Sequence, residues 1–148
     1  MPMSKRVVVA GALDPIHIGH IRHIRAAKKL GDQLVVLLNP DRDLVAKKGY
    51  VFMTWAERKE ILQALRAVDR VVEITDGDGT CAQTLARVWP DIFAKGGDRT
   101  GPENMPPGEL EVCENLHIKI VYSVGGGKVQ SSSELVRAAQ KQLEASAR

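Results

Sequence analysis

The sequence has few of the residues that build disulfides, zinc sites or stacking surfaces for bases. Its 148 residues include only two cysteines, and aromatic side chains make up 4% of the chain. Cys81 and Cys113 lie too far apart in the sequence to form a CxxC redox pair or a zinc ribbon. We therefore expect both to be packed thiols.

Long apolar runs and a strong charge bias are also absent. The run Val7 to Ala10 ends at Gly11, far short of the roughly 20 residues of a membrane helix, so we expect no membrane association and a cytoplasmic location. The 21 Lys+Arg and 18 Asp+Glu residues give a net charge of +3 that is spread along the chain. Without a basic cluster or stacking aromatics, a nucleic-acid partner is disfavoured, and a modest preference for phosphorylated ligands fits better.

What the chain does contain is typical of one globular domain spanning residues 1–148. Hydrophobic residues make up 44% and charged residues 26% of the sequence, close to ordinary globular usage. A chain of this length can bury roughly 70% of the surface that it exposes when unfolded. It therefore needs neither disulfides nor a metal to hold a core.

Apolar runs and helical patterns alternate along the sequence. The runs Val7 to Ala10 and Leu34 to Leu38 are typical of strands that are covered on both faces of a parallel sheet. This alternation predicts an α/β fold with a doubly wound, five-stranded parallel sheet. The further strands expected are 70–74, 92–94 and 117–122. The helices expected are 18–30, 54–67, 82–89 and one that starts near Ser132. Capping boxes at Thr54-x-x-Glu57 and Ser131-x-x-Glu134 mark the starts of two of these helices.

Four segments have the composition of loops, namely 41–52, 76–80, 96–107 and 123–130. All except 76–80 follow a predicted strand and lead toward a helix. In an open parallel sheet such segments meet at the carboxyl ends of the strands and form the ligand crevice. The site is therefore expected among these loops.

The segment from Gly11 to His20, which reads GALDPIHIGH, follows the first predicted strand and enters the first helix. His17 and His20 are three residues apart and share a helix face, while Gly19 leaves room for a ligand beside the backbone. The start of the helix adds free amides and a positive dipole end, an arrangement that suits a triphosphate. The alternatives are that these histidines are surface or capping residues, or part of a zinc site that has no third ligand nearby.

This segment resembles the GxFDxxHxGH signature of the nucleotidyltransferase superfamily, which includes glycerol-3-phosphate cytidylyltransferase and the adenylyltransferase domain that makes ADP-heptose. His17 to His20 also spells the HIGH signature of class I aminoacyl-tRNA synthetases, which share the Rossmann-like fold. The resemblance extends over nearly the whole chain, and the Lys-Gly-Gly-Asp run at 95–98 is closer to the heptose enzymes. Gly127 to Ser133 stands where the family has its ISTT-like segment.

Two positions depart from the family pattern. Leu13 replaces the aromatic residue that usually precedes the aspartate, which affects local packing. Cytidylyltransferases of this group have an arginine shortly before the ISTT-like segment, whereas this chain has Gly125 to Gly127 followed by Lys128. Lys128 is the candidate to supply the missing charge.

The resemblance implies the following roles. His17, His20, Lys47 and Lys128 would be catalytic, and Lys48 and Arg58 would bind the acceptor or the phosphate chain. Asp14 would orient the loop or a magnesium-bound water. The nucleotide-binding set would be Gly11, Ala12, Leu13, Asp14, Gly19, Gly97, Asp98, Ser131, Ser132 and Ser133. Several of these residues also have a purely structural alternative: solvated lysines at 47 and 48, an exposed helix arginine, a loop cap at Asp14, a turn at 96–98 and a linker or helix cap at the serines.

The reaction that the resemblance implies is attack by an acceptor phosphate on the α-phosphorus of ATP or CTP, with release of pyrophosphate. Mg²⁺ would bind mainly through the nucleotide phosphates, and a homodimer is expected. Adenylyl transfer to a sugar phosphate is the leading hypothesis. The alternatives are cytidylyl transfer to a polyol or amino-alcohol phosphate, adenylyl transfer to a phosphorylated cofactor precursor, and a nucleotide-binding module without turnover.

Overall fold

The computed structural model describes residues 4–97, 99–127 and 129–147 of the chain. Its centre is one sheet in the order β3-β2-β1-β4-β5, in which every neighbouring pair of strands is parallel. The predicted five-stranded parallel sheet is therefore confirmed. The strands are β1 (Arg6–Gly11), β2 (Gln33–Leu38), β3 (Arg70–Glu73), β4 (Ile92–Ala94) and β5 (Lys119–Val121).

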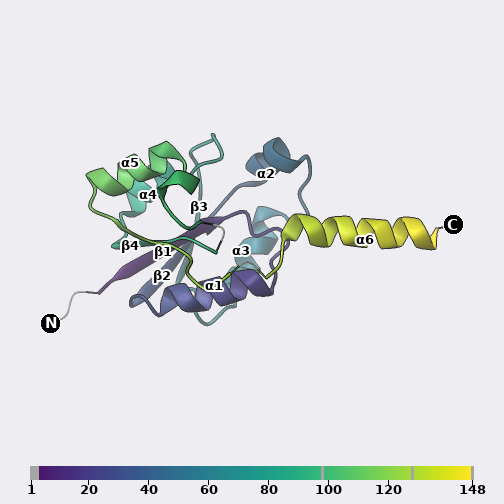
Figure 1. Cartoon of the computed structure of the whole chain (residues 1–148), viewed down its shortest axis with the longest axis horizontal. Helices are drawn as coiled ribbons and strands as arrows, with labels where there is room; N and C mark the ends of the chain where they lie inside the picture. Colours follow the sequence, from purple (N-terminus) through teal and green to yellow (C-terminus); the bar gives the residue numbers. More distant parts are fainter. Residues whose placement is uncertain (1–3, 98, 128, 148) are drawn as a thin grey trace.

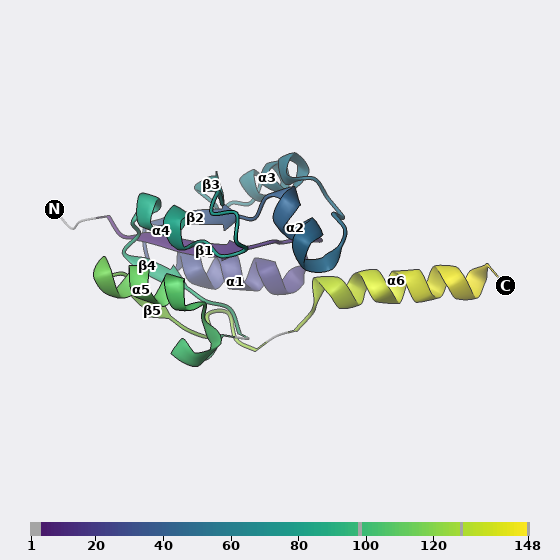
Figure 2. The same ribbon diagram turned by 90° about the horizontal axis from the view of Figure 1, so that it is seen from above.

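Helices cover both faces of this sheet (Figures 1 and 2). On one face, α1 (Ile18–Lys28) and α3 (Trp55–Gln63) contribute Ile24, Ala27 and Leu62 to a core cluster. On the other face, α4 (Ala82–Val88) and α5 (Pro107–Asn115) pack through Leu85 and Cys113. The α/β fold is thus doubly wound, as the alternation of strands and helices predicts.

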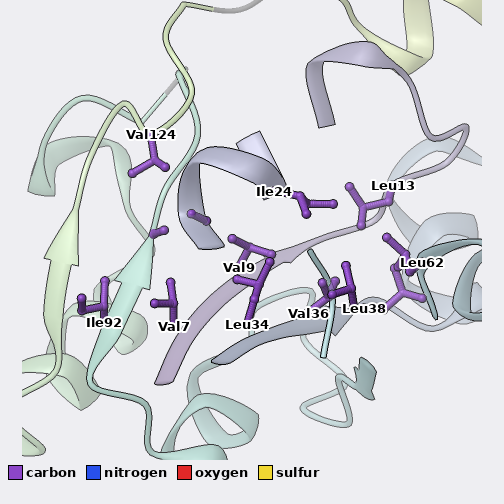
Figure 3. Packing of buried hydrophobic residues seen from close by; sticks show 13 residues of the cluster. Val7, Val9, Leu13, Ile24, Leu34, Val36, Leu38, Leu62, Ile92 and Val124 are labelled. Atoms are coloured by element: carbon purple, nitrogen blue, oxygen red, sulfur yellow. The ribbon is translucent and has the colours of Figure 1, made fainter. Parts of the chain in front are cut away.

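The core consists mainly of strand side chains that alternate between the two faces. Val7, Val9 and Val36 belong to the cluster under α1, whereas Val8 and Val35 belong to the cluster under α4 and α5. Figure 3 shows the first cluster lying against β1 and β2. Leu34 to Leu38 are completely buried, because β2 has strands on both sides and helices on both faces.

Both cysteines are packed thiols, as expected. Cys81 and Cys113 are free and buried. Burial is the main reason why the pKa of the Cys81 thiol is raised and that of the Cys113 thiol rises to about 11. These thiols are therefore protonated and unreactive near neutral pH.

Two helices lie where no helix was predicted. The segment 41–52 begins with α2 (Asp41–Lys48), whose only buried residue is Leu44, so it lacks the apolar stripe by which helices are recognised in a sequence. Gly49 ends α2 in the left-handed conformation, with φ of 84°.

Helix α5 begins at Pro107, immediately after a loop that holds the short 3₁₀ helix η1 (Pro102–Asn104). Proline at the first position of a helix is compatible with helical geometry, although it was interpreted as part of the loop.

Helix α6 (Ser132–Ser146) projects away from the sheet along the long axis of the molecule (Figures 1 and 2). The Ser131 side chain caps it by accepting a hydrogen bond from the Glu134 amide. None of its side chains is buried. Within the described part of the chain, no helix is both long enough and apolar enough to span a bilayer.

Candidate functional site

A cleft of about 660 Å³ lies at the carboxyl ends of the strands, where the loop analysis placed the site. It brings together segments that follow β1, β2 and β4 with the start of α6. The predicted residues that line it are Gly11, Ala12, Leu13, Asp14, His17, Gly19, His20, Lys47, Lys48, Gly97, Ser131, Ser132 and Ser133. Asp98 and Lys128 lie outside the described residues.

His17 and His20 form a reciprocal cap at the start of α1. The Gly19 amide donates to His17 Nδ1 at 3.0 Å, and the His17 amide donates to His20 Nδ1 at 3.2 Å. This is the pattern of a capping box, with two imidazoles in place of the usual hydroxyl and carboxylate. The rings stack with their centroids 3.8 Å apart and their planes inclined by 22°.

These hydrogen bonds determine where each ring carries its proton. A nitrogen that accepts from an amide cannot itself be protonated, so each neutral ring carries hydrogen on Nε2. Burial, together with the nearby His17 and His23 rings, lowers the pKa of His20 from 6.5 to about 3. His20 is therefore neutral near pH 7 and presents one N–H donor.

Gly19 is required by the ring of His17. A Cβ at position 19 would lie 2.8 Å from His17 Cε1 and 3.1 Å from Nδ1. The space above this glycine is thus filled by His17, so the expectation that Gly19 leaves room for a ligand is wrong. The Gly19 amide is likewise occupied by the ring, so the expectation of free amides at this helix start is wrong for Gly19.

Asp14 acts as a loop anchor. Its carboxylate accepts hydrogen bonds from the Phe52 and Met53 amides at 2.7 and 2.6 Å. Lys48 Nζ donates to the Asp14 carbonyl at 2.7 Å and lies 3.6 Å from its carboxylate. These contacts show that Asp14 caps and orients the loop, and its role toward a magnesium-bound water stays a prediction.

The two neighbouring lysines of α2 differ in their surroundings. Lys48 is tied to Asp14 and lies over the Tyr50 ring, 4.9 Å from its centroid. Lys47 is exposed at the cleft, and no hydrogen bond or ion pair joins it to another described residue. Lys47 is therefore the one of the pair whose ammonium is available to an anion.

Arg58 does not line the cleft. Its side chain is completely buried: Nε donates to the Met53 carbonyl, and Nη1 donates to those of Ala12 and Asn39 at 2.8 and 2.7 Å. Nη2 pairs with Asp41 at 2.7 Å. The predicted contact of Arg58 with a phosphate is therefore wrong, because every nitrogen of the guanidinium already bonds to the protein. Arg58 instead positions the backbone around Ala12, Asn39 and Met53. It is also not the exposed helix residue of the alternative reading.

The first turn of α6 closes the cleft next to α1. Ser132 Oγ donates to the Pro15 carbonyl at 2.8 Å, which joins the start of α6 to the loop before α1. Ser131 serves as the cap of the helix. The serine segment is therefore a helix start within the cleft, where a phosphate is favoured by the helix dipole.

Seven further residues with charged or titratable side chains line the cleft and were not predicted to be part of it. His23 Nδ1 donates to the Val124 carbonyl at 2.8 Å, and Arg22 precedes it on α1. Helical spacing would have signalled His23, which is three residues after His20. The complete set is Arg22, His23, Asp43, Cys81, Lys95, Arg99 and Glu109.

Replacing Arg58 with lysine is expected to lower the free energy of unfolding by on the order of 3 kcal/mol. Lysine keeps the charge but cannot reach the Ala12, Asn39 and Met53 carbonyls together, so buried acceptors lose their donors. Urea unfolding measures the change. Arg66→Lys, at an exposed position, is the matched control and should change stability by less than about 0.5 kcal/mol. An equal effect of both variants would contradict the positioning role.

The depressed pKa of His20 predicts a specific loss of stability in acid. The unfolded state binds a proton at this ring below about pH 6.5, whereas the folded state does so only near pH 3, so stability falls as the pH decreases through this window. In His20→Asn this dependence should be weaker than in the wild type, by up to about 1.4 kcal/mol per pH unit. Denaturant unfolding at pH 7, 6, 5 and 4 tests this, with exposed His117→Asn as the control. Parallel curves for wild type and His20→Asn would exclude the shift.

Comparisons with known proteins show which family the chain resembles. The family described as Cytidylyltransferase-like matches residues 8–123. The bifunctional protein HldE of Chromohalobacter salexigens is 36% identical over 121 residues, which cover 80% of this chain and 25% of that protein. The FAD synthase of Thermococcus sibiricus is 39% identical over 119 residues, 78% of each chain.

A solved structure shows the same fold. The lipopolysaccharide core biosynthesis protein from Thermoplasma volcanium superposes with a TM-score of 0.68 at 28% identity, covering 82% of this chain and 97% of that one. The chain spans only about a quarter of the HldE protein and 64% of the FAD synthase of Pyrococcus abyssi. The match over most of the chain and the GALDPIHIGH segment in its cleft show that the chain belongs to the cytidylyltransferase-like family of nucleotidyltransferases.

Proposed function

We propose that this chain transfers an adenylyl group from ATP to a small phosphorylated acceptor and releases pyrophosphate. The observation that carries the proposal is the pair of imidazoles at the start of α1, held by reciprocal hydrogen bonds inside the cleft. Each presents an Nε2–H donor whose direction is set by the backbone. Such preorganised donors suit phosphates that gain negative charge in a transition state.

The reaction needs no nucleophile from the protein. An acceptor phosphate is already ionised near pH 7, so the chain has to align it with the α-phosphorus and neutralise the developing charge. His17 and His20 would donate to the transferring and leaving phosphates. The lowered pKa of His20 fits this role, because its ring stays neutral near pH 7 and keeps a single N–H donor.

Positive charge and helix dipoles complete the phosphate site. Lys47 would reach the phosphates from α2, while the start of α6 would hold them through the hydroxyls of Ser131 to Ser133. Lys128 and Asp98 belong to the proposal through the family resemblance alone. A homodimer remains a further prediction from that resemblance.

The described residues fit a magnesium ion that is carried by the nucleotide. No group of three or more His, Cys, Asp or Glu side chains among them could hold a metal by itself. Asp14 is engaged by two amides and lies near Lys48, which makes it a poor ligand. We therefore propose that Mg²⁺ binds mainly through phosphate oxygens, where it neutralises charge on the triphosphate.

Two lines of support favour ATP over CTP. The Lys-Gly-Gly-Asp run at 95–98 resembles the heptose adenylyltransferases. The relatives include FAD synthases, whose product contains an adenylyl group. A sugar phosphate is the acceptor that we propose, and flavin mononucleotide, a phosphorylated cofactor precursor, is the second candidate.

Calorimetric titration with ATP and CTP, in the same buffer with Mg²⁺, tests the choice of nucleotide. We expect ATP to bind at least about tenfold more tightly, a difference of about 1.4 kcal/mol. Pyrophosphate release is then measured with ATP and a heptose 1-phosphate, flavin mononucleotide or glycerol 3-phosphate. Tighter binding of CTP would redirect the proposal to cytidylyl transfer, and binding of neither nucleotide would overturn it.

His17→Asn is expected to lower kcat by about 100- to 1000-fold, because one donor to the transition state is lost. An asparagine oxygen can still accept from the Gly19 amide, so the cap and the fold should persist. Steady-state pyrophosphate release measures the effect, with His117→Asn as the control. Turnover within about threefold of wild type in a folded His17→Asn protein would remove His17 from the mechanism.

A further inference from the structure

The loop between β5 and α6 contains three consecutive glycines and lines the cleft. Gly125, Gly126 and Gly127 follow Val124, and we call residues 124–127 the glycine loop. From here the chain continues to the serine segment at the start of α6, which lines the same cleft. Glycine loses more conformational freedom on folding than any other residue, so a loop of this composition keeps one shape only where contacts hold it.

Val124, the first residue of the glycine loop, is held from two sides. Its N–H donates to the Lys95 carbonyl, just after β4, at 2.9 Å. Its carbonyl accepts from His23 Nδ1 on α1 at 2.8 Å. The Val124 side chain is buried in the core cluster under α1 (Figure 3). The glycine loop therefore starts from a residue that joins β4 to α1.

Gly125 lies directly against the backbone of α1 at the same place. A Cβ on Gly125 would lie 2.8 Å from His23 Cα, 3.1 Å from the His23 nitrogen and 3.3 Å from the Arg22 carbonyl oxygen. The φ angle of Gly125 is 95° and that of Gly126 is 85°, yet a Cβ on Gly126 would have no atom within 4 Å. The close approach to α1 therefore belongs to Gly125 and not to the left-handed conformation as such.

The hydrogen bond to Val124 distinguishes His23 from the other two histidines of the cleft. A carbonyl can only accept, so His23 carries hydrogen on Nδ1, whereas His17 and His20 accept there from amides of their own helix start. Those two rings are thus oriented by α1. His23 uses its Nδ1–H to hold a different segment of the chain.

A second hydrogen bond holds the far end of this segment. Ser132 Oγ donates to the Pro15 carbonyl, in the loop before α1, at 2.8 Å. Val124 and Ser132 are therefore both tied to α1 or to the loop that leads into it. The stretch between them contains the glycine loop and leads into the serines that we propose as phosphate ligands.

We infer that His23 is a positioning residue that holds the glycine loop against α1 in the shape that binds the nucleotide. This inference rests on the proposed nucleotidyltransferase function and adds a residue that acts through Val124, without touching the reacting atoms. A loop that is already ordered spares the nucleotide the free energy of ordering it on binding. Loss of the anchor should therefore weaken nucleotide binding, while the transfer step, assigned to His17 and His20, continues.

The test uses two matched pairs of variants. His23→Leu keeps an apolar side chain but removes the donor, whereas the amide nitrogen of His23→Asn can take the place of Nδ1 and restore it. Gly125→Ala and Gly126→Ala both place a Cβ on a residue with positive φ, but only the first meets α1. Calorimetric titration with ATP and Mg²⁺ gives Kd, and steady-state pyrophosphate release gives KM and kcat.

We expect His23→Leu to raise the Kd and KM for ATP about 5- to 10-fold, the effect of one hydrogen bond, with kcat within about twofold of wild type. His23→Asn should recover most of the affinity. Gly125→Ala should bind ATP at least about threefold more weakly than Gly126→Ala. Hydrogen exchange gives a readout without nucleotide: the Val124 amide should exchange about tenfold faster in His23→Leu than in the wild type.

Three results would overturn the inference. They are unchanged ATP affinity in a folded His23→Leu protein, the same loss in the leucine and asparagine variants, and a fall in kcat with unchanged KM. If His23→Leu does not fold, the glycine pair decides, and equal affinities of its two members would then overturn the inference. A wild-type protein that binds neither ATP nor CTP contradicts the proposed function instead, and the exchange rates still show whether His23 holds the loop.

Discussion

The geometry of the cleft depends on one buried guanidinium. Arg58 reaches from α3 to backbone carbonyls that follow β1 and β2, at Ala12 and Asn39, and to the carbonyl of Met53. A planar group with five donors satisfies several carbonyls at once, which neither a lysine nor water could do in so small a space. Arg58 therefore positions the loop that leads to His17, from the side of that loop that faces away from the cleft.

Hydrogen bonds between side chains and the backbone also orient the imidazole pair. The first amides of a helix have no partner within the helix, and here the Gly19 amide is bonded to the His17 ring and orients it. The donor that faces a ligand becomes an imidazole N–H, which reaches farther than the backbone. The arrangement depends on glycine at position 19, since any Cβ there would contact the His17 ring. Ring, glycine and helix start thus form one unit.

Much of the fold could be predicted, because strands such as Leu34 to Leu38 are apolar on both faces and lie between helical patterns. The cleft could also be located, since loops after parallel strands meet at one edge. The remainder depends on tertiary contacts. Helix α2 has almost no apolar face and α5 starts with prolines, so neither has the usual sequence signal. The burial of Arg58 and the pairing of Glu109 with Lys95 require the folded chain, because their partners are distant in sequence.

Helix α6 joins the cleft only through its first turn, while the rest extends into solvent without a buried side chain. The direction of the helix is therefore set by a few bonds at one end, chiefly that from Ser132 to Pro15. The helix is therefore attached to the rest of the molecule at one end, and a small rotation at that end would move its C-terminus over a long distance. A phosphate bound by Ser131 to Ser133 would add further hydrogen bonds at this attachment point. The direction of α6 is thus set by the same helix start that lines the cleft.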